Sequence, residues 1–143
     1  MSSDPHDLNR FVSAQRPVFE RVLAELRAGR KTSHWMWFVF PQARGLGQSA
    51  MSLLYGIASL DEARAYLAHP TLGPRLGECV ALVTAAQAAS LRAIFGTPDD
   101  LKFRSSMTLF ALAANGDGGV YQRALARWCE GRRDERTLRL FGA

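Results

Sequence analysis

The chain has 143 residues, of which 48% are hydrophobic and 22% are charged. This length and composition match a globular domain that buries about two thirds of its unfolded surface, and they exclude an intrinsically disordered protein. The net charge of +5 comes from cations scattered along the sequence, which favours a solvated basic surface over a nucleic-acid partner.

The cysteines indicate neither a metal site nor a disulfide framework. Cys79 and Cys129 lack CxxC spacing and neighbouring histidines. We therefore expect no metal, no cofactor and a cytoplasmic location. No apolar run approaches the roughly 20 residues that cross a bilayer, and the amino terminus lacks the pattern of a signal peptide, so we expect no membrane partner. Residues 1–143 are expected to form a single globular domain, with residues 1–6 as a flexible tail.

Apolar residues recur at helical spacing along almost the whole chain. Proline and glycine positions divide this pattern, because proline disrupts a helix interior and glycine commonly ends a helix. The predicted helices and helical stripes cover residues 8–15, 17–28, 49–55, 59–68, 71–83, 90–95, 97–114 and 120–128, and a last turn begins at 134. The expected fold class is all-α, a compact bundle of about seven to nine short helices.

Two helix starts carry clear capping chemistry. Ser59-Leu60-Asp61-Glu62 matches the capping box, in which serine and glutamate each bond a backbone N–H of the other. Thr97-Pro98-Asp99-Asp100 combines a cap hydroxyl, a proline at the first helical position and two carboxylates near the positive end of the helix dipole. Capping accounts for most of the role of these two aspartates.

An aromatic segment follows the basic pair Arg30-Lys31. Residues 33–42 read Ser-His-Trp-Met-Trp-Phe-Val-Phe-Pro-Gln. These residue types suit a pocket for a flat anionic ligand, and they equally suit a core segment. A strand would place Trp35 and Trp37 on one face, whereas a helical turn would splay them apart. His34 is either a general acid or base or a residue that bonds a backbone carbonyl.

A second group of polar side chains lies on the helix predicted over 97–114. Lys102, Ser105 and Ser106 share one face at spacings of three and four. An ammonium and hydroxyls on one face suit phosphate or carboxylate oxygens, with Arg30 or Arg104 adding charge. The alternative is that the serines bond back to the preceding helical turn.

Several sequence blocks in a fixed order resemble a bacterial family of domains of unknown function, numbered 1810. The blocks span nearly the whole chain and are Gly29-Arg30-Lys31, Ser33 to Gln42, Gly45-Leu46-Gly47, Tyr55-Gly56-Ile57, Tyr66 to Pro70, Leu72-Gly73, Asp100-Leu101-Lys102 and Ser105 to Phe110. The resemblance implies a small, soluble, helical protein and brings no activity with it. Some members carry the label calpastatin, but that inhibitor is a largely disordered repeat protein, unlike this compact hydrophobic chain.

Two functional hypotheses follow from these residues. In the first, the protein binds a small anionic metabolite that is nucleotide-like or phosphorylated. The stronger form of this hypothesis adds that the protein acts on the metabolite as an enzyme. The ligand residues would be Arg30, Lys31, Trp35, Trp37, Gln42, Lys102, Ser105 and Ser106, with His34 as the acid or base. The alternative is a non-enzymatic binding or adaptor module for a protein or nucleic-acid partner. The first hypothesis requires residues 33–42 to pack near the start of the helix at Thr97.

Overall fold

The computed structural model describes residues 4–142, which form ten helices and no strand. The helices are α1 (Asn9–Gln15), α2 (Phe19–Arg27), α3 (Met36–Val39), α4 (Ala50–Tyr55), α5 (Leu60–Ala68), α6 (Leu72–Ala85), α7 (Leu91–Phe95), α8 (Asp99–Ala113), α9 (Gly119–Trp128) and α10 (Glu135–Phe141). The predicted all-α class is confirmed. The helix count exceeds the expected range by one, since the aromatic segment folds as a helical turn, α3.

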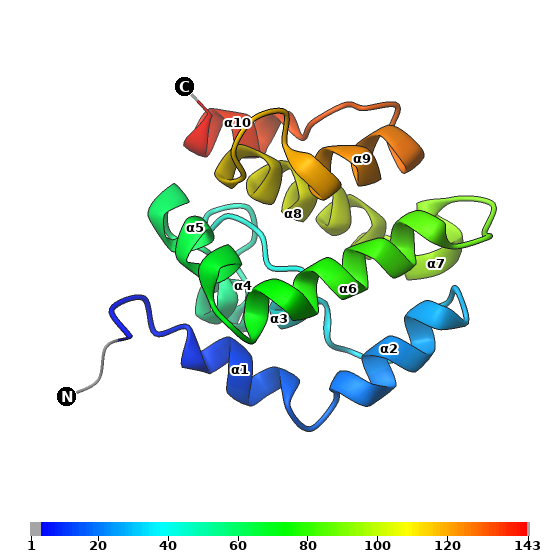
Figure 1. Ribbon diagram of the computed structural model, residues 1–143, viewed down its shortest axis with the longest axis horizontal. Helices are drawn as coiled ribbons and strands as arrows, with labels where there is room; N and C mark the ends of the chain where they lie inside the picture. Colours follow the sequence, from blue (N-terminus) through cyan, green and yellow to red (C-terminus); the bar gives the residue numbers. More distant parts are fainter. Residues whose placement is uncertain (1–3, 143) are drawn as a thin grey trace.

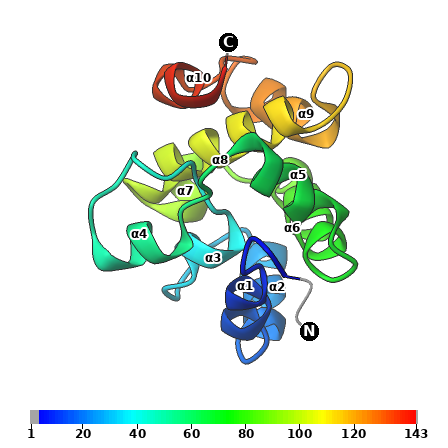
Figure 2. The ribbon, with the colours of Figure 1, turned by 90° about the vertical axis from the view of Figure 1, so that its left-hand side faces the viewer.

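Helix α8 lies at the centre of the molecule. Figure 1 and Figure 2 show α9 and α10 on one side of it and α1 and α2 on the opposite side. It contacts α5, α7, α9 and α10, and nine of its 15 residues are buried. A helix that is buried on most of its sides needs apolar residues around most of its circumference, as the sequence of α8 has.

An aromatic cluster joins the segment after α3 to α8. The ring of Phe40 lies 5.0 Å from that of Phe103, which in turn lies 5.1 Å from that of Phe95. All three side chains are buried in the hydrophobic core. The expected packing of residues 33–42 near the start of α8 is thereby confirmed.

The two predicted helix starts are only partly confirmed. The Ser59 hydroxyl accepts the backbone N–H of Glu62, but the Glu62 carboxylate bonds the N–H of Ala58 and the guanidinium of Arg10 instead of completing the capping box. The ion pair with Arg10 compensates the charge of this buried carboxylate and joins α5 to α1. The predicted Thr97 cap is wrong, since α8 begins at Asp99 with Pro98 as its N-cap residue.

The amino-terminal segment is attached where it enters α1. The Asp4 carboxylate accepts backbone N–H groups of Leu8 and Asn9 at 2.7 and 2.9 Å. Of the tail predicted over residues 1–6, residues 1–3 lie outside the described part of the chain. Between residues 4 and 142, no helix is both long enough and apolar enough to cross a bilayer.

Replacing Phe103 by alanine tests the aromatic cluster. Phe103→Ala removes a fully buried ring, and we expect it to lower the free energy of unfolding by about 3–5 kcal/mol because a cavity remains. The control Leu101→Ala, on the exposed side of α8, should change it by less than about 0.5 kcal/mol. Urea unfolding measures both values, and equal effects of the two variants would contradict the role given to the cluster.

Candidate functional site

A buried carboxylate, Glu25 on α2, shapes the chain that leads into α3. It accepts the backbone N–H groups of Thr32 and Ser33 at 2.7 and 3.0 Å. It also accepts the Ser33 hydroxyl at 2.6 Å and the indole N–H of Trp35 at 2.9 Å. One side chain therefore holds two consecutive residues of the turn, Thr32 and Ser33, and fixes the orientation of Trp35, two residues further on.

These hydrogen bonds also set the ionisation of Glu25. Burial alone raises the pKa of a carboxyl group, but the donors from Ser33, Thr32 and Trp35 outweigh it and lower the pKa of Glu25 from 4.5 to about 2. The group is therefore a carboxylate at any physiological pH. The sequence pattern does not reveal this role of Glu25, because a glutamate on an amphipathic helix resembles a surface residue when its backbone donors are unknown.

The two tryptophans of the aromatic segment point in different directions, as a helical turn predicts. Trp35 is 1% exposed and packs in the core, so its ring offers almost no surface to a ligand. Trp37 is half-buried and retains an accessible part of its ring.

The two predicted groups of polar residues meet at Asp99. The Lys31 ammonium lies 3.0 Å from one oxygen of the Asp99 carboxylate, and the Lys102 ammonium lies 3.6 Å from the other. The chain has 18 lysines and arginines, of which these two are the only lysines. Sequence analysis assigned Asp99 mainly to helix capping. The rarity of lysine was the signal that could have linked the two positions.

Each lysine also lies against one tryptophan. The Lys31 ammonium is 5.2 Å from the centre of a Trp35 ring, and the Lys102 ammonium is 5.6 Å from that of Trp37. Both distances allow a cation–π attraction. The backbone of Lys31 is held beside α7 as well, because its N–H donates to the carbonyl of Ile94 at 2.7 Å.

A groove opens next to this lysine pair, and we name it the Gln42 groove. Its volume is about 340 Å³. It is lined by Gln42, Leu46, Gly47, Ser52, Pro98, Leu101, Lys102, Arg104, Ser105, Asp134 and Arg136. Three predicted ligand residues, Gln42, Lys102 and Ser105, thus come together from distant parts of the sequence.

The Gln42 side of the groove is fixed by backbone contacts. The Ile57 N–H donates to the carbonyl of Gln42 at 2.9 Å, within an isolated parallel bridge between Ala43 and Ile57. Gly56 allows this close approach, because a Cβ atom there would lie 2.9 Å from the Cα atom of Arg44. Gln42 therefore has a defined backbone position at the edge of the groove.

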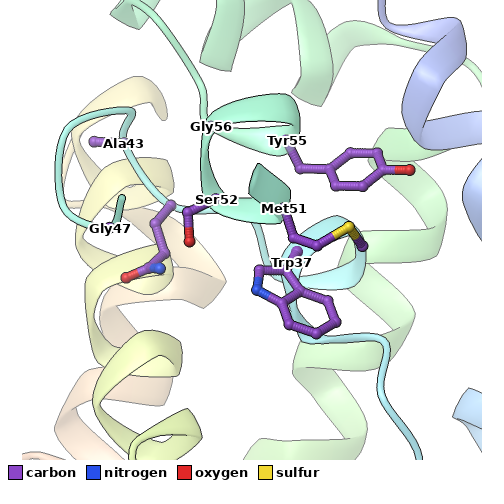
Figure 3. Close-up of a pocket in the computed structure, with 8 residues that line it drawn as sticks. Trp37, Ala43, Gly47, Met51, Ser52, Tyr55 and Gly56 are labelled. Carbon is purple, nitrogen blue, oxygen red and sulfur yellow. The ribbon is translucent and has the colours of Figure 1, made fainter. Parts of the chain in front are cut away.

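A smaller hollow adjoins the groove and shares Gln42, Gly47 and Ser52 with it. Figure 3 shows the side chains of Trp37, Met51 and Tyr55 gathered on one side of α4, with Ser52 on the other. The hollow has a volume of only about 10 Å³, enough for about one water molecule. The hollow is too small for a metabolite.

The lining of the Gln42 groove carries more positive than negative charge. The lining contains three cations, Lys102, Arg104 and Arg136, and one carboxylate, that of Asp134. The guanidinium of Arg104 donates to backbone carbonyls of residues 132 and 133 at 2.9 Å, and that of Arg136 donates to the carbonyl of Leu46 at 3.0 Å. Carbonyls orient these arginines without neutralising them, so the groove attracts anions.

The two serines of α8 have different environments. The Ser105 hydroxyl lines the groove but donates to the carbonyl of Leu101 at 3.2 Å, as the alternative interpretation predicted. Ser106 is fully buried, and its hydroxyl has no hydrogen-bond partner within residues 4–142. The structure therefore does not bring Ser106 to the groove with the other predicted ligand residues.

Arg30 and His34 remain outside this arrangement. Both side chains are exposed, and neither lines the Gln42 groove. Across the described residues, no group of three or more histidine, cysteine, aspartate or glutamate side chains is placed to hold a metal ion.

Neutralising Glu25 tests its structural role. We expect Glu25→Gln to lower the free energy of unfolding at pH 7 by about 3 kcal/mol, the value that corresponds to a pKa shift from 4.5 to about 2. Glu20→Gln, on an exposed position of the same helix, is the matched control and should have little effect. Denaturant unfolding measures both variants.

The pH dependence gives an independent check. A carboxyl group with a lowered pKa stabilises the fold above its unfolded-state pKa, and this contribution is lost as the pH falls toward the folded-state pKa. The stability difference between the wild type and Glu25→Gln should therefore shrink as the pH falls from 4.5 to about 2. A difference that stays constant over this range would show that the Glu25 charge does not hold the turn.

Comparisons with known proteins identify the family. A family model described as "Protein of unknown function (DUF1810)" matches residues 5–141. The chain is 56% identical to the conserved hypothetical protein Rv1873 from Mycobacterium tuberculosis, whose crystal structure superposes with a TM-score of 0.95 over 98% of this chain and 99% of that chain. A search of curated proteins finds no match. The chain therefore belongs to the DUF1810 family, as its ordered sequence blocks predicted.

Proposed function

We propose that this protein binds a small anionic metabolite, phosphorylated or nucleotide-like, in the Gln42 groove. The observation that supports this most is the convergence of Gln42, Lys102 and Ser105 on one groove that two further cations, Arg104 and Arg136, also line. Cationic donors held at fixed positions are the groups that recognise phosphate and carboxylate oxygens.

The size and lining of the groove suit a metabolite of this class. Its volume of about 340 Å³ lies within the range of small-molecule sites, about 300–1,000 Å³. Lys102 and Arg104 on α8 and Arg136 on α10 would contact the anionic group, and Gln42 offers donors and an acceptor for a polar edge of the ligand. Leu46, Pro98 and Leu101 supply apolar surface for the uncharged part.

The proposal assigns binding, and no acid–base step, to the groove. His34 is exposed and lies outside the groove lining, so a bound ligand would not contact it there. A cytosolic location is part of the proposal. It is supported by Cys79 and Cys129, which are both free thiols.

A second candidate function is a protein-binding module. Leu53 and Leu54 are neighbours on α4, and each is 51% exposed. They line a shallow surface hollow together with Arg10 and Arg44. Adjacent exposed leucines beside arginines are typical of contact surfaces for a protein partner.

A thermal-shift panel of nucleotides, sugar phosphates and inorganic pyrophosphate tests the first candidate. A ligand present at about 100 times its Kd stabilises the fold by about 2.7 kcal/mol, which raises the Tm by roughly 5–10 °C for a domain of this size. We expect at least one anionic member of the panel to give such a shift. No shift with any compound at millimolar concentration would contradict the proposal.

Charge-removal variants locate the site on the protein. Lys102→Gln and Arg136→Gln should each weaken binding about tenfold, because each removes a charged hydrogen-bond donor from the groove. Arg139→Gln is the matched control. Arg139 lies on the same helix as Arg136 but is exposed and paired with Glu135 at 3.6 Å, so its loss should leave the affinity unchanged. Equal losses in all three variants would indicate a general charge effect.

A further inference from the structure

The carboxylate of Asp99 has two ammonium neighbours at unequal distances. At 3.0 Å, the contact with Lys31 is a hydrogen-bonded ion pair. At 3.6 Å, the contact with Lys102 is longer than a hydrogen bond and depends on charge alone. Asp99 is thus firmly bound to one lysine and only loosely associated with the other.

The two lysines also differ in their freedom to move. The Lys31 side chain is 8% exposed, and its backbone is tied to Ile94. Its ammonium lies over Trp35, which Glu25 holds in place. The Lys102 side chain is 26% exposed and lines the Gln42 groove, and the ring it approaches, that of Trp37 at 5.6 Å, is only half-buried. Lys31 therefore stays with Asp99, while Lys102 is able to turn toward an anion.

One carboxylate neutralises the charge of one ammonium group. Here the Asp99 carboxylate is paired with the buried lysine, Lys31. We propose that Lys31 is a positioning residue of the anion site: it satisfies Asp99 and so leaves the charge of Lys102 available to a ligand in the Gln42 groove. This inference rests on the proposed function. Without Lys31, the Asp99 carboxylate would pull Lys102 into its own ion pair.

The choice of lysine at both positions fits this role. Lysine is a compact point charge on a flexible stem, whereas arginine forms a rigid two-pronged contact with a carboxylate. An arginine at position 102 would bind the Asp99 carboxylate through two hydrogen bonds. A lysine dissociates from the carboxylate more readily. The chain uses lysine only at positions 31 and 102 among its 18 cationic residues, and both contact Asp99.

Labelling of amines by an acetyl ester tests the arrangement without any ligand. The chain has two lysine side chains, so peptide mass spectrometry reports the acetylation rate of Lys102 directly. We expect Lys31→Met to slow the labelling of Lys102 at least threefold, because Asp99 then holds it. Asp99→Asn should change the rate by less than twofold, because Lys31 already keeps Asp99 from holding Lys102, and the double variant Lys31→Met, Asp99→Asn should restore the rate of Asp99→Asn.

Titration with inorganic pyrophosphate tests the connection to the groove. Lys31→Met should weaken binding at least fivefold although Lys31 does not line the groove, and Asp99→Asn in the same chain should restore it. Arg27→Met is the control, because it removes an exposed cation from α2 that has only a long contact with Glu78, at 3.9 Å. A merely structural role of Lys31 predicts no rescue by the second substitution.

The outcomes separate the two proposals. An unchanged labelling rate of Lys102 in Lys31→Met overturns the positioning role, and so does a rise of more than twofold in Asp99→Asn, because Asp99 would then hold Lys102 although Lys31 is present. Slower labelling with unchanged pyrophosphate affinity overturns its connection to the groove. A wild-type protein that binds no anion overturns the proposed function instead, and the labelling rates still decide whether Lys31 frees Lys102. Asp99→Asn keeps both lysines, so its result stands even if Lys31→Met does not fold.

Discussion

The arrangement of the candidate site depends on the buried carboxylate of Glu25. By accepting donors from Thr32, Ser33 and Trp35, it turns the chain back across the end of α2 and sets Trp35 into the core. Lys31, at the start of the same turn, is thereby directed toward Asp99. A charge on α2 that never contacts the groove thus decides where an ammonium on another segment can lie.

Helix α8 combines the roles of core and site. Its buried face carries Phe103 into the aromatic cluster, and its other face presents Lys102 and Arg104 to the groove. Because the core holds α8 on several sides, the two cations have a rigid support. Rigid supports favour binding, since less conformational freedom is lost when the ligand arrives.

Local sequence signals predicted the helices well and the site in part. The Ser59 cap and the helical spacing depend on neighbouring residues, which the sequence shows directly. The site depends on tertiary contacts. Residue type was enough to identify Gln42 and Lys102 as candidates. Residue type does not separate Ser105 from Ser106, because these neighbours differ only by a rotation of about 100° around the helix. That rotation places Ser105 at the groove and Ser106 in the core. The roles of Glu25 and Asp99 required knowledge of which backbone amides and which lysines come near them.

The composition of the groove walls has a consequence for the synthesis of the protein. The walls come from residues 42–52, 98–105 and 134–136, so they are separated by long stretches of chain. A growing polypeptide on the ribosome lacks the last wall until α10 has emerged from the exit tunnel. If the proposed function holds, a fragment that ends before α10 would lack Asp134 and Arg136, and with them one wall of the proposed binding groove.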